Sequence, residues 1–356
     1  MVGLADDPAA APSPTPEIRV FVPTFRRPAL LARALESLRR QTFTEWVAEI
    51  HNDDPDDRRP QEIAAALDDR RIEFHQHAAN LGAVAVFNLI YRPVRERYFA
   101  ILEDDNWWEP RFLEVMLAEM ERHPHVTLAW CNQRIAEELP DGSWRVTDEF
   151  ARPLTPEAAP EPDLVDFGDL RQAIGAHHGN GAMVMRVVDD ASYETPGDWP
   201  FGGIEHWRER MIGHPLLYVQ EPLAVFSRTL ETARTEGRRE WAKAQVLLAA
   251  SFVKHSAFDA ARLAALLADA RASRPPATTP LLIAGLIEPR CRRLLLQSRW
   301  RDWLLLLRGA CRRPAILWHM LRCRRRHPDW WRGLDRHTEA RFAQVRSGAP
   351  ARACFR

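Results

Sequence analysis

A regular alternation of strand-like and helix-like segments at the start of the chain restricts the fold more than any other feature. Short segments rich in β-branched and aromatic residues cover 18–25, 47–53, 71–77 and 98–105. Between them, apolar residues recur at helical spacing over 28–43, 60–69 and 81–94. Such alternation predicts an α/β fold, in which a mixed, mainly parallel sheet is flanked by helices. Ligands bind such sheets at the carboxyl ends of the strands, so a site is expected there.

The alternation ends near residue 230 and divides the chain into three predicted regions. Residues 1–16 are rich in proline and alanine and lack the apolar run of a signal peptide, so we expect a flexible leader. Residues 17–230 form the expected α/β domain. Residues 231–356 show helical patterns, interrupted near 274–280, and are predicted to form a helical, basic C-terminal region.

Charge is distributed unevenly between these regions. The chain has 49 basic and 49 acidic residues, but from Arg290 to Arg356 there are 18 arginines and only four acidic residues. The rest of the chain therefore carries the acidic surplus. Leucines and tryptophans among the arginines are typical of helices on anionic membrane surfaces. Packing within the chain, contact between copies and polyanion binding are alternatives, but no nucleic-acid binding motif is present.

Composition excludes several classes of protein. A hydrophobic fraction of 46% is too high for a disordered chain, and no apolar run approaches the roughly 18 to 20 residues of a membrane-spanning helix. The five cysteines form no CxxC pair and are too sparse for a disulfide framework or a zinc site. We expect a soluble globular protein with free thiols, in the cytoplasm or at the inner face of the membrane.

Polar segments lie at or just after the ends of the four predicted strands. They are Pro23-Thr24-Phe25-Arg26, Asn52-Asp53-Asp54, Asn80-Leu81-Gly82 and Glu103-Asp104-Asp105-Asn106. A single acidic residue at a strand end is commonly a helix cap or a turn former. Because the carboxyl ends of parallel strands share one edge, four such segments together predict one binding site.

The last segment carries the strongest chemical signal. In an extended chain, Glu103 and Asp105 point to one face and Asp104 to the other. Three consecutive carboxylates repel one another unless a cation or hydrogen-bond donors offset their charge. Oxygen ligands of this kind suit magnesium or manganese bound to a diphosphate. Capping of a helix near Pro110 accounts for only one of the three acids.

Together these segments resemble a known family. The ordered set PTFxR, Asp-Asp, Asn-x-Gly and EDDxxWxP is similar to the inverting family-two glycosyltransferases, over about residues 18–228. The resemblance implies a Rossmann-like sheet of GT-A type and a magnesium or manganese cofactor. It also implies transfer of a sugar, with inversion, from a nucleoside-diphosphate sugar to a hydroxyl acceptor. The acceptor is left open between a glycan, a lipid-linked molecule and a natural product.

The resemblance also assigns roles to individual residues. The expected donor-binding residues are Pro23, Thr24, Arg26, Asp53, Asp54, Asn80, Gly82, Glu103 and Asp104, and the expected metal ligand is Asp105. Within this set, Asp53 or Asp54 is expected to contact the base or the ribose. One departure is visible, because Pro55-Asp56 follows the aspartate pair where the family often has Gly-Ser.

The expected catalytic base lies about a hundred residues after the metal motif. The family has a Glu-Asp pair there, and this chain has Glu205-His206. Glu205 taking the role with a one-residue shift is one interpretation, and His206 is another, because a neutral imidazole can deprotonate a hydroxyl. A third interpretation is a helix start without a catalytic role.

Two other pairs of residues each have two interpretations. Trp107 and Trp108 either stack on a sugar ring or pack within the protein, and His177 and His178 either contact a ligand or belong to a turn.

Two other functions share some of these features. A nucleotide-sugar binding protein without activity would be a transferase that has lost its base, and the departure at His206 keeps this alternative open. A nucleotidyltransferase would have a similar sheet and acidic metal site. It is disfavoured because no glycine-rich phosphate loop with a following lysine is present.

Overall fold

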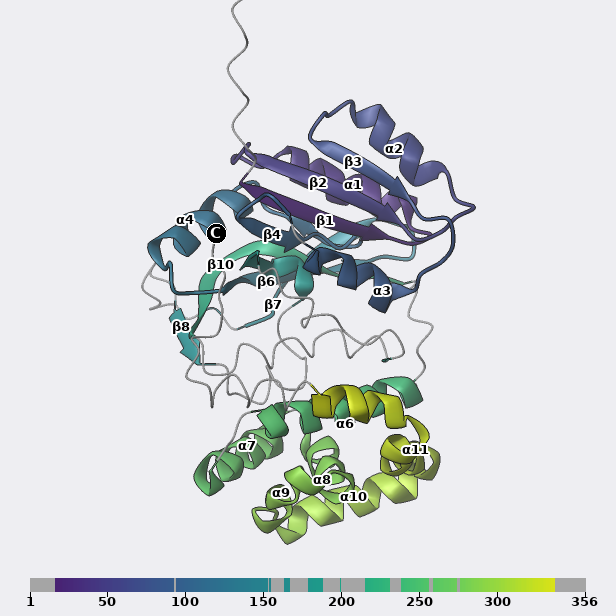
Figure 1. Ribbon diagram of the computed structural model, residues 1–356, viewed down its shortest axis with the longest axis vertical. Helices are drawn as coiled ribbons and strands as arrows, with labels where there is room; N and C mark the ends of the chain where they lie inside the picture. The colour runs from purple at the N-terminus through teal and green to yellow at the C-terminus, as the bar shows by residue number, and fades with distance from the viewer. Residues whose placement is uncertain are drawn as a thin grey trace, which may run out of the picture.

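The structure is a computed structural model that describes residues 17–92, 94–152, 154, 163–166, 179–187, 199, 215–230, 238–255, 259–273 and 276–336. These residues form a sheet flanked by helices at one end of the molecule, and a group of C-terminal helices forms the other end (Figure 1). The predicted α/β class, mixed sheet and helical extension are confirmed. The expected leader, residues 1–16, lies outside the described residues.

The first half of the sheet is parallel and follows the predicted alternation. Its strands are β1 (Ile18–Thr24), β2 (Trp46–Asn52), β3 (Ile72–Gln76) and β4 (Tyr98–Ile101), and the helices between them are α1 (Pro28–Arg39), α2 (Arg59–Leu67) and α3 (Ala83–Asn88). In space the strands are ordered β3-β2-β1-β4. Thr24 is in register with Asn52, and Asn52 with Gln76, so three strands end at the same edge.

Strand β1 is mainly apolar, apart from Arg19 and Thr24, because both faces of the sheet are covered. Ile18, Val20 and Val22 belong to the hydrophobic core that also contains buried residues of α1 and α4 (Phe112–Arg122). Phe21 points to the other face, into a second core. A parallel strand buried on both faces reads as a continuous hydrophobic run, which is the pattern in the sequence.

The second half of the sheet is mixed. Its strands are β5 (Trp107–Trp108), β6 (Leu128–Glu138), β7 (Trp144–Phe150), β8 (Asp163–Asp166), β9 (Met183–Arg186) and β10 (Pro215–Arg228). Strand β9 lies between β4 and β6 and is antiparallel to both, whereas β6 and β10 are parallel. Antiparallel neighbours do not need a crossover helix, which explains why the alternation weakens after the fourth strand.

The C-terminal region is helical. Its helices are α6 (Arg238–His255), α7 (Ala260–Ala272), α8 (Thr278–Ile287), α9 (Arg293–Leu296), α10 (Trp300–Arg312) and α11 (Pro314–Arg326), and the predicted interruption falls between α7 and α8. Phe21 of β1, Val86 of α3 and Val246 of α6 belong to one buried cluster, so the hydrophobic core is continuous from the sheet into these helices. Within the described residues, no helix has both the length and the apolar character needed to cross a bilayer.

Candidate functional site

A cleft of about 1180 Å³ lies at the edge where the parallel strands end. Ten of the twelve predicted site residues line it: Pro23, Thr24, Arg26, Asp53, Asp54, Asn80, Gly82, Glu103, Asp104 and Asp105. The remaining two, Glu205 and His206, lie outside the described residues. The fold therefore brings all four strand-end segments to one cavity.

Asp53 anchors the loop that follows β3. One carboxylate oxygen accepts a hydrogen bond from the backbone N–H of Leu81 at 2.7 Å, and the other accepts from the N–H of Gly82 at 2.9 Å. The side chain of Asn80 donates to the backbone oxygen of Asp53 at 3.0 Å. Gly82 has a φ of +82°, which favours glycine over other residues. The Asn-x-Gly motif is thus explained by this loop, which forms one wall of the cleft.

Asp54 forms an ion pair with Arg26, and both residues line the cleft at the ends of the parallel strands. The Arg26 Nε donates to Asp54 Oδ2 at 2.7 Å, and the N–H of Asp56 donates to Asp54 Oδ1 at 3.1 Å. These hydrogen bonds, with that of Arg26 the stronger cause, lower the pKa of Asp54. Arg26 itself has a left-handed backbone with φ of +59°. The pair therefore joins the ends of β1 and β2.

The three acids after β4 do not lie as the sequence predicted. The chain leaves the strand at Ile101 and turns, with the N–H of Asn106 donating to the Glu103 oxygen at 3.0 Å. Asp104 and Asp105 consequently both contact the guanidinium of Arg27, whose Nη1 lies 3.4 Å from the carboxylate of Asp104 and 2.6 Å from that of Asp105. The expectation that alternate acids face opposite sides is wrong, because it assumed an extended chain through residue 105.

Asp104 is the buried member of this group. It accepts a hydrogen bond from the Thr24 hydroxyl at 2.9 Å, which joins the first and fourth segments. Burial and the neighbouring charge of Asp105 raise the pKa of Asp104 to about 7. Asp104 is therefore suited to holding the loop together, while Asp105 is the more accessible acid, with a side chain 24% exposed.

The residues around Asp105 fit a divalent ion that is bound mainly through a substrate. Arg27 occupies one carboxylate oxygen, and no described protein group donates to the other. Magnesium and manganese take oxygen ligands and commonly use one or two carboxylates together with water and substrate phosphates. A single available carboxylate oxygen beside a large cleft meets that requirement.

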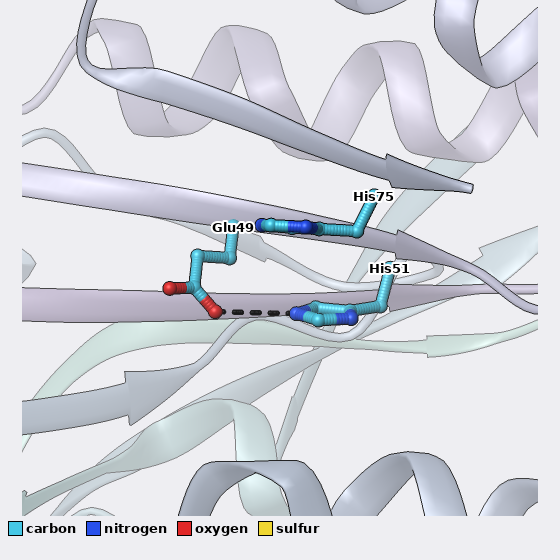
Figure 2. A group of neighbouring side chains, drawn as sticks. All are labelled: Glu49, His51 and His75. Carbon is cyan, nitrogen blue, oxygen red and sulfur yellow. Dashed lines mark hydrogen bonds and ion pairs between the residues drawn. The ribbon is translucent and has the colours of Figure 1, made fainter. Parts of the chain in front are cut away.

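A different group of side chains has the spacing of a metal site among the described residues. Glu49, His51 and His75, on β2 and β3, each offer a ligand atom within 4.8 Å of the others (Figure 2). The carboxylate of Glu49 is already paired with the guanidinium groups of Arg19 and Arg92. Two cations at the same carboxylate oppose a third positive charge, so we assign this group a structural role.

That role is to connect the interior of the sheet with the cleft. His51 Nε2 lies 3.2 Å from Glu49, and His51 Nδ1 lies 3.1 Å from His77 Nε2. The other nitrogen of His77 is 3.1 Å from Asp53. A hydrogen-bonded series thus runs from Glu49 through two imidazoles to the aspartate that anchors the loop at Leu81. The sequence contains the spacing of these residues but no motif that links them.

The tryptophans after the acidic motif pack in the protein and do not line the cleft. Trp108 stacks on Phe112, and its Nε1 donates to the Gly181 oxygen at 2.6 Å. Trp107 and Trp144 contact the guanidinium of Arg33, at 4.1 Å and 3.8 Å from the ring centres. The packing interpretation is thus the one that the contacts support.

Arg33 is a site residue that sequence reasoning missed. Its Nη2 donates to the backbone oxygen of Asp105 at 2.7 Å, so it holds the turn that presents the proposed metal ligand. Burial lowers the pKa of Arg33 to about 10, and the nearby acids act in the opposite direction. Nothing in the helical pattern of α1 distinguishes this arginine from those on the exposed face.

The Gly-Asn-Gly segment supports the acidic turn from behind. Gly179 donates its N–H to Gln133 at 3.1 Å. A Cβ on Gly181 would lie 3.3 Å from Asn106 and 3.5 Å from Glu103, so a larger residue would press on the turn. The preceding histidines, His177 and His178, lie outside the described residues.

The far wall of the cleft comes from the C-terminal helices. It comprises Trp241, Ala242 and Gln245 of α6, Thr279 and Pro280 of α8, and Arg313, Ile316 and Met320 at the start and along α11. Packing within the chain was one of the alternatives for this region, but a helical pattern indicates only which face is apolar and not which element covers it. The cavity is therefore closed by both parts of the chain.

Comparison with known proteins agrees with this geometry. The family model "Glycosyl transferase family 2" matches residues 19–192. WcaA of Escherichia coli (strain K12), which carries the name of a colanic acid biosynthesis glycosyl transferase, is 32% identical over 108 residues, 30% of this chain and 39% of WcaA. EpsH of Bacillus subtilis (strain 168), which also carries the name of a glycosyltransferase, is 33% identical over 105 residues, 29% of this chain and 30% of EpsH. The matched part thus spans less than half of each relative.

Solved structures show the same fold over most of the chain. TarS of S. aureus, residues 1–349 in complex with UDP, has a TM-score of 0.54 at 12% identity and covers 94% of this chain and 93% of its own. The complex of the same protein with UDP-GlcNAc has a TM-score of 0.56 at 11% identity, with coverage of 94% and 93%. The family match contains all four strand-end segments, so residues 19–192, the part of the chain that carries the cleft-lining motifs of the sheet, are similar to glycosyl transferase family 2.

Proposed function

We propose that the protein is a glycosyltransferase that moves a sugar from a nucleoside-diphosphate sugar to a hydroxyl acceptor with inversion. The observation that carries this proposal is the convergence of four separate strand-end segments on one cleft of about 1180 Å³. That volume is at or above the usual range for small-molecule sites, roughly 300 to 1,000 Å³, and suits a donor and part of an acceptor. The TarS structures, which contain UDP or UDP-GlcNAc, have the same fold and support a donor of this class.

In this proposal the two ends of the donor contact different segments. The loop held by Asp53 and the Arg26–Asp54 pair form the nucleotide side, together with Pro23 and Thr24. Asp105 would hold magnesium or manganese, and the bound ion would supply positive charge to balance the departing diphosphate. Arg27 and Arg33 fix the position of Asp105 through its carboxylate and its backbone oxygen.

The remaining chemistry is assigned to Glu205 or His206. One of them removes the proton from the acceptor hydroxyl, whose oxygen then attacks the anomeric carbon while the bond to the diphosphate breaks. A direct displacement of this kind inverts the configuration. Comparison of Glu205→Gln and His206→Gln separates the two, because only the variant that lacks the base should lose transfer while it still binds donor.

The same proposal covers the organisation and location of the protein. We propose that residues 17–230 contain the catalytic machinery and that residues 231–356 complete the cleft, after a leader over residues 1–16. We place the reaction in the cytoplasm or at the inner face of the membrane. The three described buried cysteines, Cys131, Cys291 and Cys323, are free thiols, which suits a reducing compartment.

A thermal-shift screen of UDP, GDP, ADP and CDP, each with and without manganese, tests the donor class. We expect one nucleotide at about 100 times its dissociation constant to stabilise the fold by about 2.7 kcal/mol, and more so with manganese. This corresponds to a rise in Tm of several degrees. If no nucleotide raises the Tm, the proposal fails. Binding without manganese-dependent transfer or donor hydrolysis would favour the nucleotide-sugar binding protein instead.

Replacement of Asp53 by asparagine is expected to weaken both the fold and donor binding. The variant loses one charged acceptor shared by the N–H groups of Leu81 and Gly82, and such hydrogen bonds contribute about 1.5 to 3 kcal/mol each. Urea denaturation should show a loss of at least about 1.5 kcal/mol. Asp68→Asn is the matched control, because Asp68 is exposed and its φ of +45° suits asparagine. Equal stability of the two variants would contradict the anchoring role.

A further inference from the structure

Helix α10 presents an apolar stripe to solvent. Trp300, Leu304, Leu307 and Cys311 recur at intervals of four, three and four residues, which places them on one face. Trp300 is 69% exposed, Leu307 is 61% exposed and Cys311 is exposed, whereas Leu304 is half-buried. The opposite face contains buried Asp302 and Leu306, so the helix already has an inward face that packs against the protein. The outward stripe is therefore additional to what folding requires.

The elements on either side of α10 in the chain carry two more exposed apolar side chains. Leu296, at the end of α9, is 81% exposed, and Trp318 of the adjacent helix α11 is 50% exposed. We call the surface formed by Leu296, Trp300, Leu304, Leu307, Cys311 and Trp318 the α10 surface. Helices α9 and α10, which carry most of these residues, lie at the end of the molecule away from β3 and α2 (Figure 1).

The charges around the α10 surface are of one sign. Residues 290–326 contain twelve arginines and a single acidic residue, Asp302. Asp302 is buried and bound by Arg271 at 2.7 Å, so it does not offset the exposed cations. Arg301, Arg308 and Arg312 are exposed on α10 itself, beside the apolar stripe.

We propose that the α10 surface docks on an anionic membrane surface. Tryptophan and leucine gain from leaving water at the boundary of the acyl chains, while the arginines meet the negative headgroups. A symmetric contact with a second copy would bring arginines against arginines, which like-charge repulsion disfavours. A nucleic acid would satisfy the arginines but would leave Leu296 and Leu307 in water. A bilayer with anionic headgroups accounts for both the charge and the apolar stripe.

Vesicle sedimentation of the full chain tests this proposal. We expect it to bind vesicles that contain phosphatidylglycerol and to bind pure phosphatidylcholine at least about tenfold more weakly. High salt should reduce the binding, because exposed charges are screened. The double variant Trp300→Ser with Leu307→Ser should lose at least about tenfold in partition, because it removes two large apolar groups from the contact.

A matched control distinguishes loss of docking from general damage. Val146 and Leu154 are each 48% exposed and belong to the sheet-containing part of the chain. Val146→Ser with Leu154→Ser should leave vesicle binding unchanged, and both double variants should retain the wild-type Tm because all four side chains are exposed.

Three results would overturn the proposal. The first is equal or absent binding to both kinds of vesicle. The second is a Trp300/Leu307 variant that binds vesicles as the wild type does. The proposal also fails if wild-type binding to duplex DNA is as tight as binding to vesicles and the variant retains it, because the surface is then a general polyanion site. The third is a dimer, measured by light scattering, that becomes monomeric in the Trp300/Leu307 variant and never binds vesicles, which would assign the surface to a second copy.

Discussion

Replacing Asp105 by alanine is expected to lower the rate of sugar transfer by at least about 100-fold while the protein stays folded. The carboxylate is the accessible acid of the turn after β4, and its loss removes the proposed ligand for the divalent ion that balances the departing diphosphate. Folding should be little affected, because Arg27 retains Asp104 as a partner at 3.4 Å. Transfer assays across a manganese titration measure the effect, and the Tm reports the fold.

Asp56→Ala provides the control for the Asp105 experiment. Asp56 is exposed and lines the same cleft, but it lies outside the acidic turn. It should retain transfer within a few-fold, whereas Asp105→Ala should also lose any increase in Tm that depends on manganese. Full activity of Asp105→Ala would rule out the metal assignment without affecting the nucleotide assignment, which rests on other segments.

Replacing Glu49 by glutamine is expected to destabilise the fold by about 3 to 5 kcal/mol. Glu49 is only 2% exposed, and its carboxylate is bound by Arg19, Arg92 and His51. Glutamine removes the negative charge and replaces one of the two acceptor oxygens by an NH2 donor that faces these cationic groups. Arg19 keeps Glu96 at 2.8 Å and Arg92 is partly exposed, so the lower end of this range is expected. Urea denaturation at pH 7 measures the loss.

The pH dependence of this loss has a definite direction. Burial alone raises the pKa of Glu49, but the hydrogen bond with His51 and the charges of Arg19 and Arg92 outweigh it and lower the pKa to about 2. A depressed pKa gives stability that is present above the ordinary value of 4.5 and is lost as the pH falls toward 2. The difference between wild type and Glu49→Gln should therefore be constant from pH 7 to 5 and shrink below pH 4.5.

Glu73→Gln is the matched control for Glu49→Gln. Glu73 also faces Arg19, at 3.8 Å, but its side chain is 58% exposed. Exposed ion pairs contribute about 0 to 1 kcal/mol, so little change is expected. A similar loss in both variants, or a Glu49 difference that is as large at pH 3 as at pH 7, would show that the buried carboxylate does not act through its charge.

The sequence was sufficient to predict the cleft because the relevant residues follow a local rule. Asp53 and Asn80 each follow a strand of the parallel sheet, and the topology of such a sheet brings strand ends to one edge. The order of the strands and the antiparallel insertion of β9 between β4 and β6 were not predictable in the same way, since they depend on pairing between distant segments.

Other parts of the site depend on tertiary contacts that leave no periodic signal. Arg27 and Arg33 lie among several arginines around α1, and only the folded turn at Asp105 shows which of them contact it. The path of the acids was predicted wrongly because alternation applies to an extended chain, and the hydrogen bond from Asn106 to Glu103 ends that geometry. Met320 of α11 reaches the cleft from more than 200 residues away in the sequence.

Helix α11 separates two environments across its own diameter. Ile316 and Met320, four residues apart, line the cleft, whereas Trp318 and Arg322 lie on the opposite side of the helix and are exposed. Any displacement of α11 therefore changes the volume of the cavity and the shape of the outer surface at once. By thermodynamic linkage, a partner that favours one position of this helix must change donor affinity by the same factor that the donor changes affinity for the partner.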